Sequence, residues 1–191
     1  MPTKIQGGID KVQDGVVGLS DCDTELYGKI TALTTINLGE AKTASGTVVD
    51  FTGIPAGVKR VTVMFDGVSV SGTSFPLFQL GDSGGIENTG YVVTTSVNVV
   101  GTAEITSTAG FPLYSNYAAN TIQGAIVFCL VNDTTNSWVG SGSFGVQGGV
   151  TSCIYLGGRK SLSNTLDRLR ITTVNGTDEF DAGTINISWE F

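Results

Sequence analysis

Apolar and polar residues alternate through long stretches of this chain, and this period of two constrains the fold more than any other feature. In RVTVMFDGVSV, which begins at Arg60, Val61, Val63 and Phe65 fall on one face and the intervening residues on the other. Successive side chains of a β-strand point to opposite faces of its sheet. The pattern therefore predicts strands that turn one face toward a core.

The same signal recurs from about residue 45 to the last residue of the chain. Turns rich in Gly, Asn, Asp and Ser separate the segments, and no convincing helix of about ten residues follows residue 45. Many short strands without alternating helices predict an all-β sandwich or jelly roll for residues 45–191. The segments are SFPLFQL, GYVVTTSVNVV, GAIVFCLV, SWVGSGSFGV, TLDRLRITTV and INISWEF.

Residues 1–44 have a different texture, in which short apolar segments alternate with Gly, Asp, Lys and Thr without a sustained period. Leu26, Ile30 and Leu33 have helical spacing, but Gly28 and the neighbouring threonines weaken a helix there. We interpret residues 1–44 as an extended or partly strand-like N-terminal arm. A solvated arm would fray, so we expect a partner or a second copy to hold it.

The chain is acidic, with a net charge of −7 and a pI near 4.4, and its basic residues form no stripe. Nucleic-acid binding depends on clustered Lys and Arg that neutralise phosphates, so no nucleic-acid partner is expected. No stretch approaches the ~20 apolar residues of a membrane span. The N-terminus also lacks the apolar core of a secretory signal. We expect synthesis in a bacterial-type cytoplasm without membrane insertion.

The three cysteines, Cys22, Cys129 and Cys153, fit neither a disulfide framework nor the paired spacing of a zinc site. Cys129 lies inside QGAIVFCLV, where the simplest interpretation is a small core residue, and the same interpretation is open for Cys153. We therefore expect reduced thiols, no bound metal and no cofactor.

Residues 81–85, GDSGG, match the nucleophile motif of trypsin-like serine proteases letter for letter. The serine of those enzymes needs a histidine base that an aspartate orients, and this chain contains no histidine. We interpret the motif as a turn between strands, where Gly84 and Gly85 permit positive φ and Asp82 or Ser83 caps backbone N–H groups. No catalytic residue is assigned, and an enzyme is not expected.

Two long segments carry a resemblance to a known family. VVDFTGIPAGVKRVTVMFDGVSVSGTSFPLFQLGDSGGIENTGY and the ending LDRLRITTVNGTDEFDAGTINISWEF are similar to segments of tailed-bacteriophage virion proteins. Those proteins include tail fibres and related small structural proteins, and the similarity covers residues 47–191. The resemblance implies a jelly-roll-like β-sandwich that forms trimers, in a chain that works in the virion after assembly in the host cytoplasm.

The resemblance leaves two structural roles open. The first is a short fibre or spike component that docks through residues 1–44 and contacts host surface polysaccharide. The second is a capsid decoration, cement or head-fibre protein that stabilises the shell. The low charge and many hydroxyl side chains also favour contacts between identical copies, with a homotrimer as the expected assembly.

The stretch AGFPLYSNYAANTIQG is long, has little alternation and carries Tyr114, Asn116 and Tyr117. Loops of this kind hold binding function when a rigid scaffold supports them. We consider these three residues candidates for a glycan or partner contact. The alternative is that the aromatic rings pack at the edge of the sandwich or at a subunit interface.

Two further groups lie near the C-terminus. Asp178, Glu179 and Asp181 form an acidic cluster, for which an exposed loop and a Ca²⁺ site are both open. The terminal segment INISWEF places three large apolar side chains on the face expected to point inward. These residues, which we expect to contact the core or a second copy, are Ile187, Trp189 and Phe191.

Overall fold

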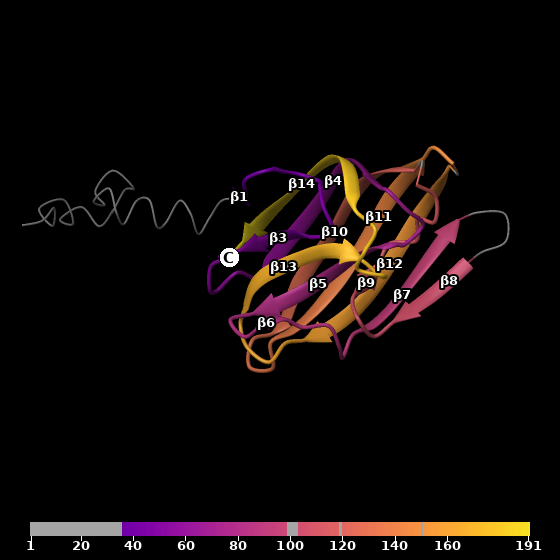
Figure 1. Cartoon of the computed structure of the whole chain (residues 1–191). Coiled ribbons are helices and arrows are strands. Elements are labelled where there is room, and N and C mark those ends of the chain that lie inside the picture. Colours follow the sequence, from indigo (N-terminus) through magenta and orange to yellow (C-terminus); the bar gives the residue numbers. More distant parts are fainter. Residues whose placement is uncertain (1–35, 99–102, 119, 150) are drawn as a thin grey trace, which may run out of the picture.

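The computed structural model describes residues 36–98, 103–118, 120–149 and 151–191. These residues contain no helix and form fourteen strands in two antiparallel sheets that pack face to face (Figure 1). The predicted fold, a jelly-roll-like β-sandwich, is thus confirmed in its all-β class and its two packed sheets. Residues 1–35 of the predicted N-terminal arm lie outside the described residues.

The larger sheet has nine strands in the order β1-β14-β4-β10-β11-β12-β7-β8, and β2 also pairs with β14. Five of these strands are ten or more residues long, and they form the broad centre of the sheet with β7. The bounds are β1 Asn37–Leu38, β2 Lys42–Thr43, β4 Arg60–Val70, β7 Val92–Asn98, β8 Ala103–Ser107, β10 Thr121–Asn132, β11 Ser137–Gln147, β12 Ser152–Ser161 and β14 Phe180–Glu190.

The smaller sheet has five strands in the order β3-β13-β5-β6, with β9 paired to β5. Strand β5 is buried along its whole length. The bounds are β3 Val49–Thr52, β5 Pro76–Asp82, β6 Gly85–Ile86, β9 Phe111–Pro112 and β13 Leu166–Thr173.

The sheet begins earlier in the chain than the boundary predicted at residue 45. Strands β1 and β2 both pair with β14, which places Asn37 opposite Trp189 and Thr43 opposite Thr184. Ala44 is buried in the core. Residues 36–44 are therefore part of the edge of the sandwich, because the last strand of the chain offers them a free hydrogen-bonding edge.

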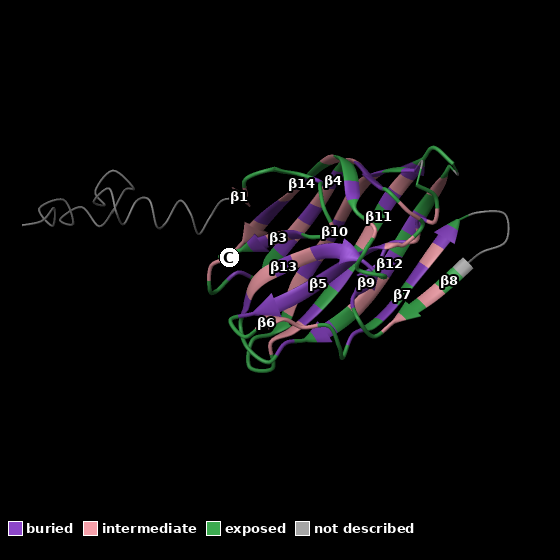
Figure 2. Cartoon of the chain, viewed as in Figure 1, coloured by how far each residue is buried: buried purple, intermediate pink, exposed green. Residues whose placement is uncertain are grey.

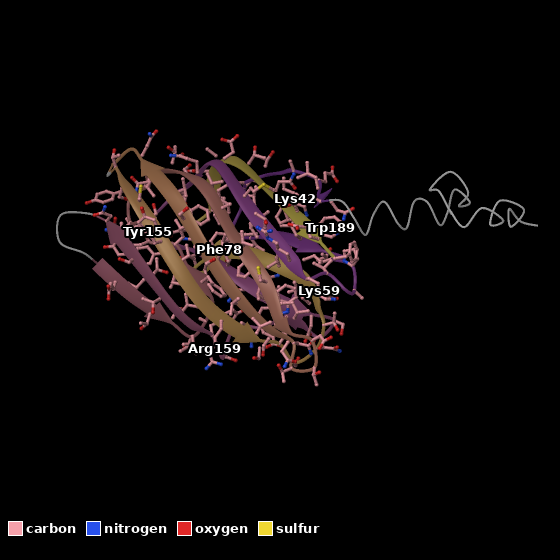
Figure 3. The ribbon with its side chains drawn as sticks, turned by 180° about the vertical axis from the view of Figure 1, so that it is seen from behind. Lys42, Lys59, Phe78, Tyr155, Arg159 and Trp189 are labelled. Carbon is pink, nitrogen blue, oxygen red and sulfur yellow. The ribbon has the colours of Figure 1, made fainter. Side chains whose placement is uncertain are left out.

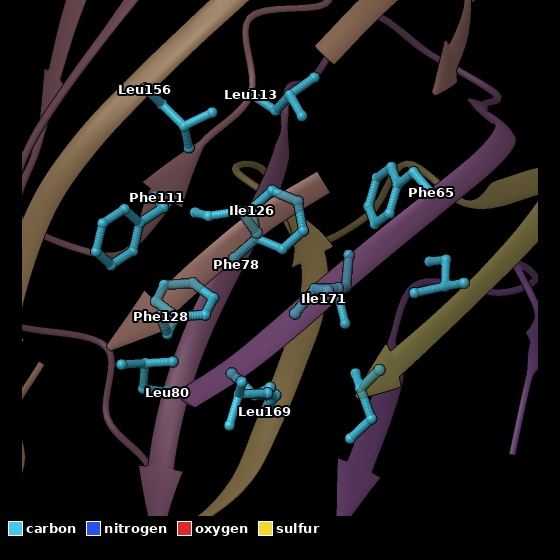
Figure 4. Close-up of a cluster of buried hydrophobic side chains, with 14 of the residues drawn as sticks. Phe65, Phe78, Leu80, Phe111, Leu113, Ile126, Phe128, Leu156, Leu169 and Ile171 are labelled. Atoms are coloured by element: carbon cyan, nitrogen blue, oxygen red, sulfur yellow. The ribbon is translucent and has the colours of Figure 1, made fainter. Parts of the chain in front are cut away.

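Large aromatic side chains between the sheets hold them together (Figure 4). Phe78 on β5 lies 5.2 Å from Phe65 on β4 and 5.9 Å from Phe144 on β11, measured between ring centroids. Aromatic rings at such separations add to the hydrophobic stabilisation that their burial provides. Buried residues alternate with exposed ones along the strands of the larger sheet, as Figure 2 shows.

The alternation predicted for β4 and β14 is confirmed, since Val61, Val63 and Phe65 are buried and so are Ile185 and Ile187. The core placement predicted for Cys129, and left open for Cys153, was wrong, and Cys22 lies outside the described residues. Cys129 is half-buried and Cys153 is exposed, because the neighbours Phe128 and Ile154 take the inward positions. In the continuous apolar run of β10, composition alone did not show which residues face inward.

Candidate functional site

The GDSGG segment forms a tight hairpin between β5 and β6, as predicted. Ser83 is exposed at the turn, and Gly85 has a φ of 128° that suits glycine. The Asp82 carboxylate accepts the N–H of Gly84 at 2.8 Å, which caps the turn in the way expected of an Asx turn. Ser83 is a turn residue here.

A group of polar side chains lies beneath this hairpin, and we call it the hairpin network: Asp82, Glu87, Tyr91, Lys160 and Ser163. Lys160 is buried and forms an ion pair with Glu87. The Ser163 hydroxyl donates to Asp82 at 2.7 Å, and the Ser163 N–H donates to Glu87 at 2.7 Å. The network therefore joins the β5–β6 hairpin to the loop between β12 and β13.

Tyr91 is the buried centre of the hairpin network. Its hydroxyl donates to the carbonyl of Glu87 at 2.7 Å and accepts the N–H of Leu80 at 2.8 Å. The Lys160 ammonium lies 5.3 Å from the centre of the Tyr91 ring, within range of a cation–π attraction. A tyrosine whose hydroxyl bonds to backbone a few residues upstream is also a recurring corner motif of β-sandwiches.

The carboxylates of the network are held in their charged form. The hydrogen bond from Ser163 lowers the pKa of Asp82 although burial opposes ionisation. Burial also opposes ionisation of Glu87, but the bonds from Lys160 and Ser163 outweigh it and lower the pKa of Glu87. Burial raises the pKa of Tyr91, so its phenol stays protonated. Each of these groups bonds to another part of the fold, so the network holds the β5–β6 hairpin to the loop between β12 and β13.

The predicted contact residues Tyr114, Asn116 and Tyr117 lie in the segment between β9 and β10. The Tyr114 ring packs against Phe75 with centroids 4.8 Å apart, while Tyr117 is exposed. Asn116 is half-buried. Tyr117 also lies close to Gly149, where an added Cβ would approach the Tyr117 Cβ to 2.9 Å. Tyr117 thus offers the largest accessible surface of the three residues.

The acidic cluster is built into its loop by separate contacts. Asp178 accepts the N–H of Ser74 and the side-chain amide of Asn175, both at 2.8 Å. The bonds from Asn175 and Ser74 lower the pKa of Asp178. Asp181 accepts a hydrogen bond from Ser69. No group of three His, Cys, Asp or Glu side chains in the described part of the chain is placed to hold a metal ion.

The C-terminal strand fills the end of the sandwich. Ile187 is buried, and Trp189 and Phe191 are partly buried and pack against the core. The Trp189 and Ile187 side chains share the inward face, whereas Glu190 points outward and forms an ion pair with Arg60 at 3.5 Å. These three apolar residues contact the core of their own chain.

Sequence reasoning missed the outer face of the nine-stranded sheet, which Figure 3 shows from its own side. Tyr155 and Arg159 of β12 lie toward opposite ends of this face. Exposed apolar side chains gather on its central strands, including Val139 on β11 and Val92 on β7. An alternation with a period of two predicts which residues share a face. It does not show that the residues on the outer face of this sheet include exposed apolar side chains.

Comparisons with known proteins identify no relative: no family model, no curated protein and no solved structure matches this chain. Within the described ranges, no helix has the length and apolar character needed to cross a membrane.

Proposed function

We propose that this chain is a non-enzymatic structural protein of a tailed-bacteriophage virion, where it forms part of a short fibre or spike. The proposal starts from the similarity of residues 47–191 to virion proteins of such phages. In this role residues 1–35 of the predicted arm dock onto other virion proteins, since residues 36–44 belong to the edge of the sandwich, and the sandwich is exposed outward. The protein is assembled in the cytoplasm of the bacterial host.

The main support for a structural role is the outer face of the nine-stranded sheet, which is wide and carries little charge. Strands β7, β10 and β11 contain no charged residue at all. Surfaces that meet only water usually carry many charged side chains of both signs. A broad face of small, uncharged and apolar residues suits packing against other protein copies, and we propose a homotrimer.

The order of the strands supports docking at one edge. Strand β1 stands at one edge of the sheet and β8 at the other. A segment that leads from β1 into the virion would leave the β8 edge farthest from the docking point. A hollow of about 400 Å³ lies at that edge beside β7 and β8, with Thr94, Thr106 and Thr108 among its lining residues. Within this proposal, Tyr117 contributes to contact with host surface polysaccharide.

A second role fits the same surfaces. A capsid decoration or cement protein also needs a docking segment and a face that packs on protein neighbours. The sandwich has neither a coiled coil nor a long shaft among its described residues, features that would favour a fibre. The two roles place the protein on different parts of the particle.

Electron microscopy of purified particles with a gold-labelled antibody against residues 36–191 separates the two roles. A fibre or spike component places label at the tail or at discrete vertices. Dense label over the whole shell would contradict the fibre role and support the decoration role. An antibody preincubated with purified protein serves as the control for specific labelling.

A further inference from the structure

The hollow of about 400 Å³ beside β7 and β8 has hydroxyl groups along its border. Val92 and Thr94 line it from β7, and Thr106 and Thr108 line it from β8 and the residues that follow. All four residues are exposed, and the register sets Thr94 directly opposite Thr106. Binding sites for small ligands have volumes of this order, with a few polar groups that converge on the ligand.

The threonine hydroxyls of this hollow are available to a ligand. The neighbouring Thr95 is engaged in the fold, since its hydroxyl donates to the carbonyl of Pro112 at 2.7 Å. Within the described residues, the three threonines that line the hollow have no side-chain hydrogen bond to protein. Each hydroxyl can donate one hydrogen bond and accept others, so the hollow suits a ligand that is itself rich in hydroxyl groups.

Arg159 of β12 lies next to the hollow, because the register pairs it with Val92. Arg159 is exposed, and among the Lys and Arg residues that the structure describes it alone has no hydrogen bond, ion pair or ring contact with protein. The basic residues that do have such a partner are Lys42, Lys59, Arg60, Lys160, Arg168 and Arg170. The planar fork of donors on Arg159 is therefore free to bind a carboxylate.

Strand β12 supplies two more features on the same face. Tyr155 is 54% exposed, and Figure 3 shows it and Arg159 toward opposite ends of this face. Gly157 lies between them, opposite Thr94, and leaves the surface open there because it has no side chain. Four residues of a strand span about 13 Å. An exposed ring and a free guanidinium thus stand this far apart, with the hydroxyls of the hollow beside the gap.

The charges around the hollow favour one orientation of an anionic ligand. Glu104 of β8 is exposed and pairs with Ser96, two rows of residues away from Arg159. The register neighbours of Arg159 are the uncharged Val92 and Val139. An anionic group is therefore attracted to the Arg159 end and repelled from the Glu104 end. The net charge of −7 has less effect, since physiological salt screens exposed charges beyond about 8 Å.

We propose that this hollow and the adjacent part of β12 bind an acidic sugar, one that carries a carboxylate, within a bacterial surface polysaccharide. The Arg159 guanidinium holds the carboxylate through paired N–H donors. Thr94 and Thr106 exchange hydrogen bonds with the sugar hydroxyls, and the apolar face of the Tyr155 ring lies against C–H groups of the next sugar. The inference rests on the proposed function and names the class of sugar that the exposed sandwich contacts.

Nuclear magnetic resonance of the ¹⁵N-labelled full chain tests the proposal, with trigalacturonate, a chain of three acidic sugars, as the probe. Its methyl ester is the matched neutral probe, because it differs only in lacking the carboxylate charges. We expect trigalacturonate to shift the amide signals of β7, β8 and β12 around the hollow in a saturable way. The ester should bind about tenfold more weakly, as expected for the loss of a charge-assisted hydrogen bond.

Arg159→Gln tests the contact with the carboxylate, because it removes the charge and keeps a side chain of similar length. Binding of trigalacturonate should weaken by about tenfold or more. Arg60→Gln is the matched control, since Arg60 lies on the same face and is already paired with Glu190. This variant should bind the probe as wild type does.

Gly157→Val tests the position of the sugar by filling the gap on β12. An added Cβ would meet only the carbonyl oxygen of Gly140, at the ordinary contact distance of 3.8 Å, so the variant should fold and lose binding. Gly145→Val is the matched control on the same face, where the nearest atom to an added Cβ is the side-chain amide nitrogen of Gln123 at 3.4 Å. It should keep binding, and cooperative unfolding of both variants checks that they are folded.

Several outcomes would overturn the proposal. Equal binding of the acid and its ester, or unchanged binding by Arg159→Gln, would contradict an acidic sugar. Stronger shifts of the same signals by inorganic phosphate would replace the carboxylate with a phosphate group. Shifts confined to residues 114–117 would move the contact to Tyr117, and the absence of any saturable shift would remove the site.

The position of the protein in the particle tests the proposed function separately. A chain that is present in virions and does not bind trigalacturonate contradicts the sugar site and leaves the structural role intact. A chain that binds trigalacturonate through Arg159 and is absent from virions supports the site and contradicts the structural role.

Discussion

Tyr91→Phe removes a single buried oxygen atom and tests whether the hairpin network stabilises the fold. The lost hydroxyl accepts the Leu80 N–H at 2.8 Å and donates to the Glu87 carbonyl at 2.7 Å. Tyr91 is 1% exposed, so water cannot easily replace either bond. Leaving a buried donor unsatisfied costs about 1–3 kcal/mol. We expect the free energy of unfolding to fall by this amount, since the aromatic ring still fills its place.

Equilibrium unfolding in urea, followed by tryptophan fluorescence, measures this change. The free energy extrapolated to water should fall while the slope against urea concentration stays the same, because the surface exposed on unfolding is unchanged. Tyr155→Phe is the control, since this tyrosine is exposed. Surface substitutions of this kind usually change stability by less than about 0.5 kcal/mol.

Equal stability of Tyr91→Phe and wild type would refute the reasoning. It would mean that the two hydrogen bonds of the Tyr91 hydroxyl contribute nothing beyond what the ring provides. A loss well above the range for one unsatisfied donor would point instead to collapse of the whole network, including the ion pair of Lys160 with Glu87.

Three further predictions concern the core, acid and backbone geometry. Ile187→Ala should lower the free energy of unfolding by about 2–5 kcal/mol, as for other buried large-to-small changes, whereas Glu190→Ala on the opposite face should change it little in the same urea titration. Asp82 and Glu87 have lowered pKa values in the folded state, so they stabilise the fold fully above their ordinary pKa values of 3.8 and 4.5, and this stabilisation is lost as the pH falls further. Asp82→Asn should therefore make the melting temperature less dependent on pH in the acid range. A pH profile of melting temperature that equals that of wild type would contradict the network. Gly183→Ala should be destabilising in thermal melts, because Gly183 has a φ of 92° and an added Cβ would lie 2.5 Å from the backbone of Gly67; a melting temperature equal to wild type would show that this bulge relaxes freely.

The alternation in β4 and β14 shows how much of this fold the sequence predicts. In β4 and β14 the alternation is clean, and the inward residues Val63 and Ile185 are buried as predicted. In β10 the apolar run is continuous, so only pairing with β4 and β11 decides that Phe128 points inward and Cys129 outward. Long-range pairing, which a local pattern does not contain, therefore fixed the face of β10.

The same limit applies to the candidate sites. Arg159 and Lys160 are adjacent basic residues, yet strand alternation exposes Arg159 and buries Lys160 against Glu87, which is distant in sequence. The strands β1 and β2 are two residues each and carry no period that could be detected. Their partner, β14, is distant in sequence and also pairs with β4 on its other side.

Peptide mass spectrometry of purified phage particles tests the central claim, a structural role in the virion, most directly. Particles from lysed bacteria that carry this gene are purified on a density gradient and washed in high salt, and the copy number of this chain is measured against a major capsid protein. The account predicts peptides from residues 36–191 in the particle fraction at a fixed copy number across preparations. Recovery of the chain only in the soluble fraction of the lysate, with none in intact particles, would contradict it.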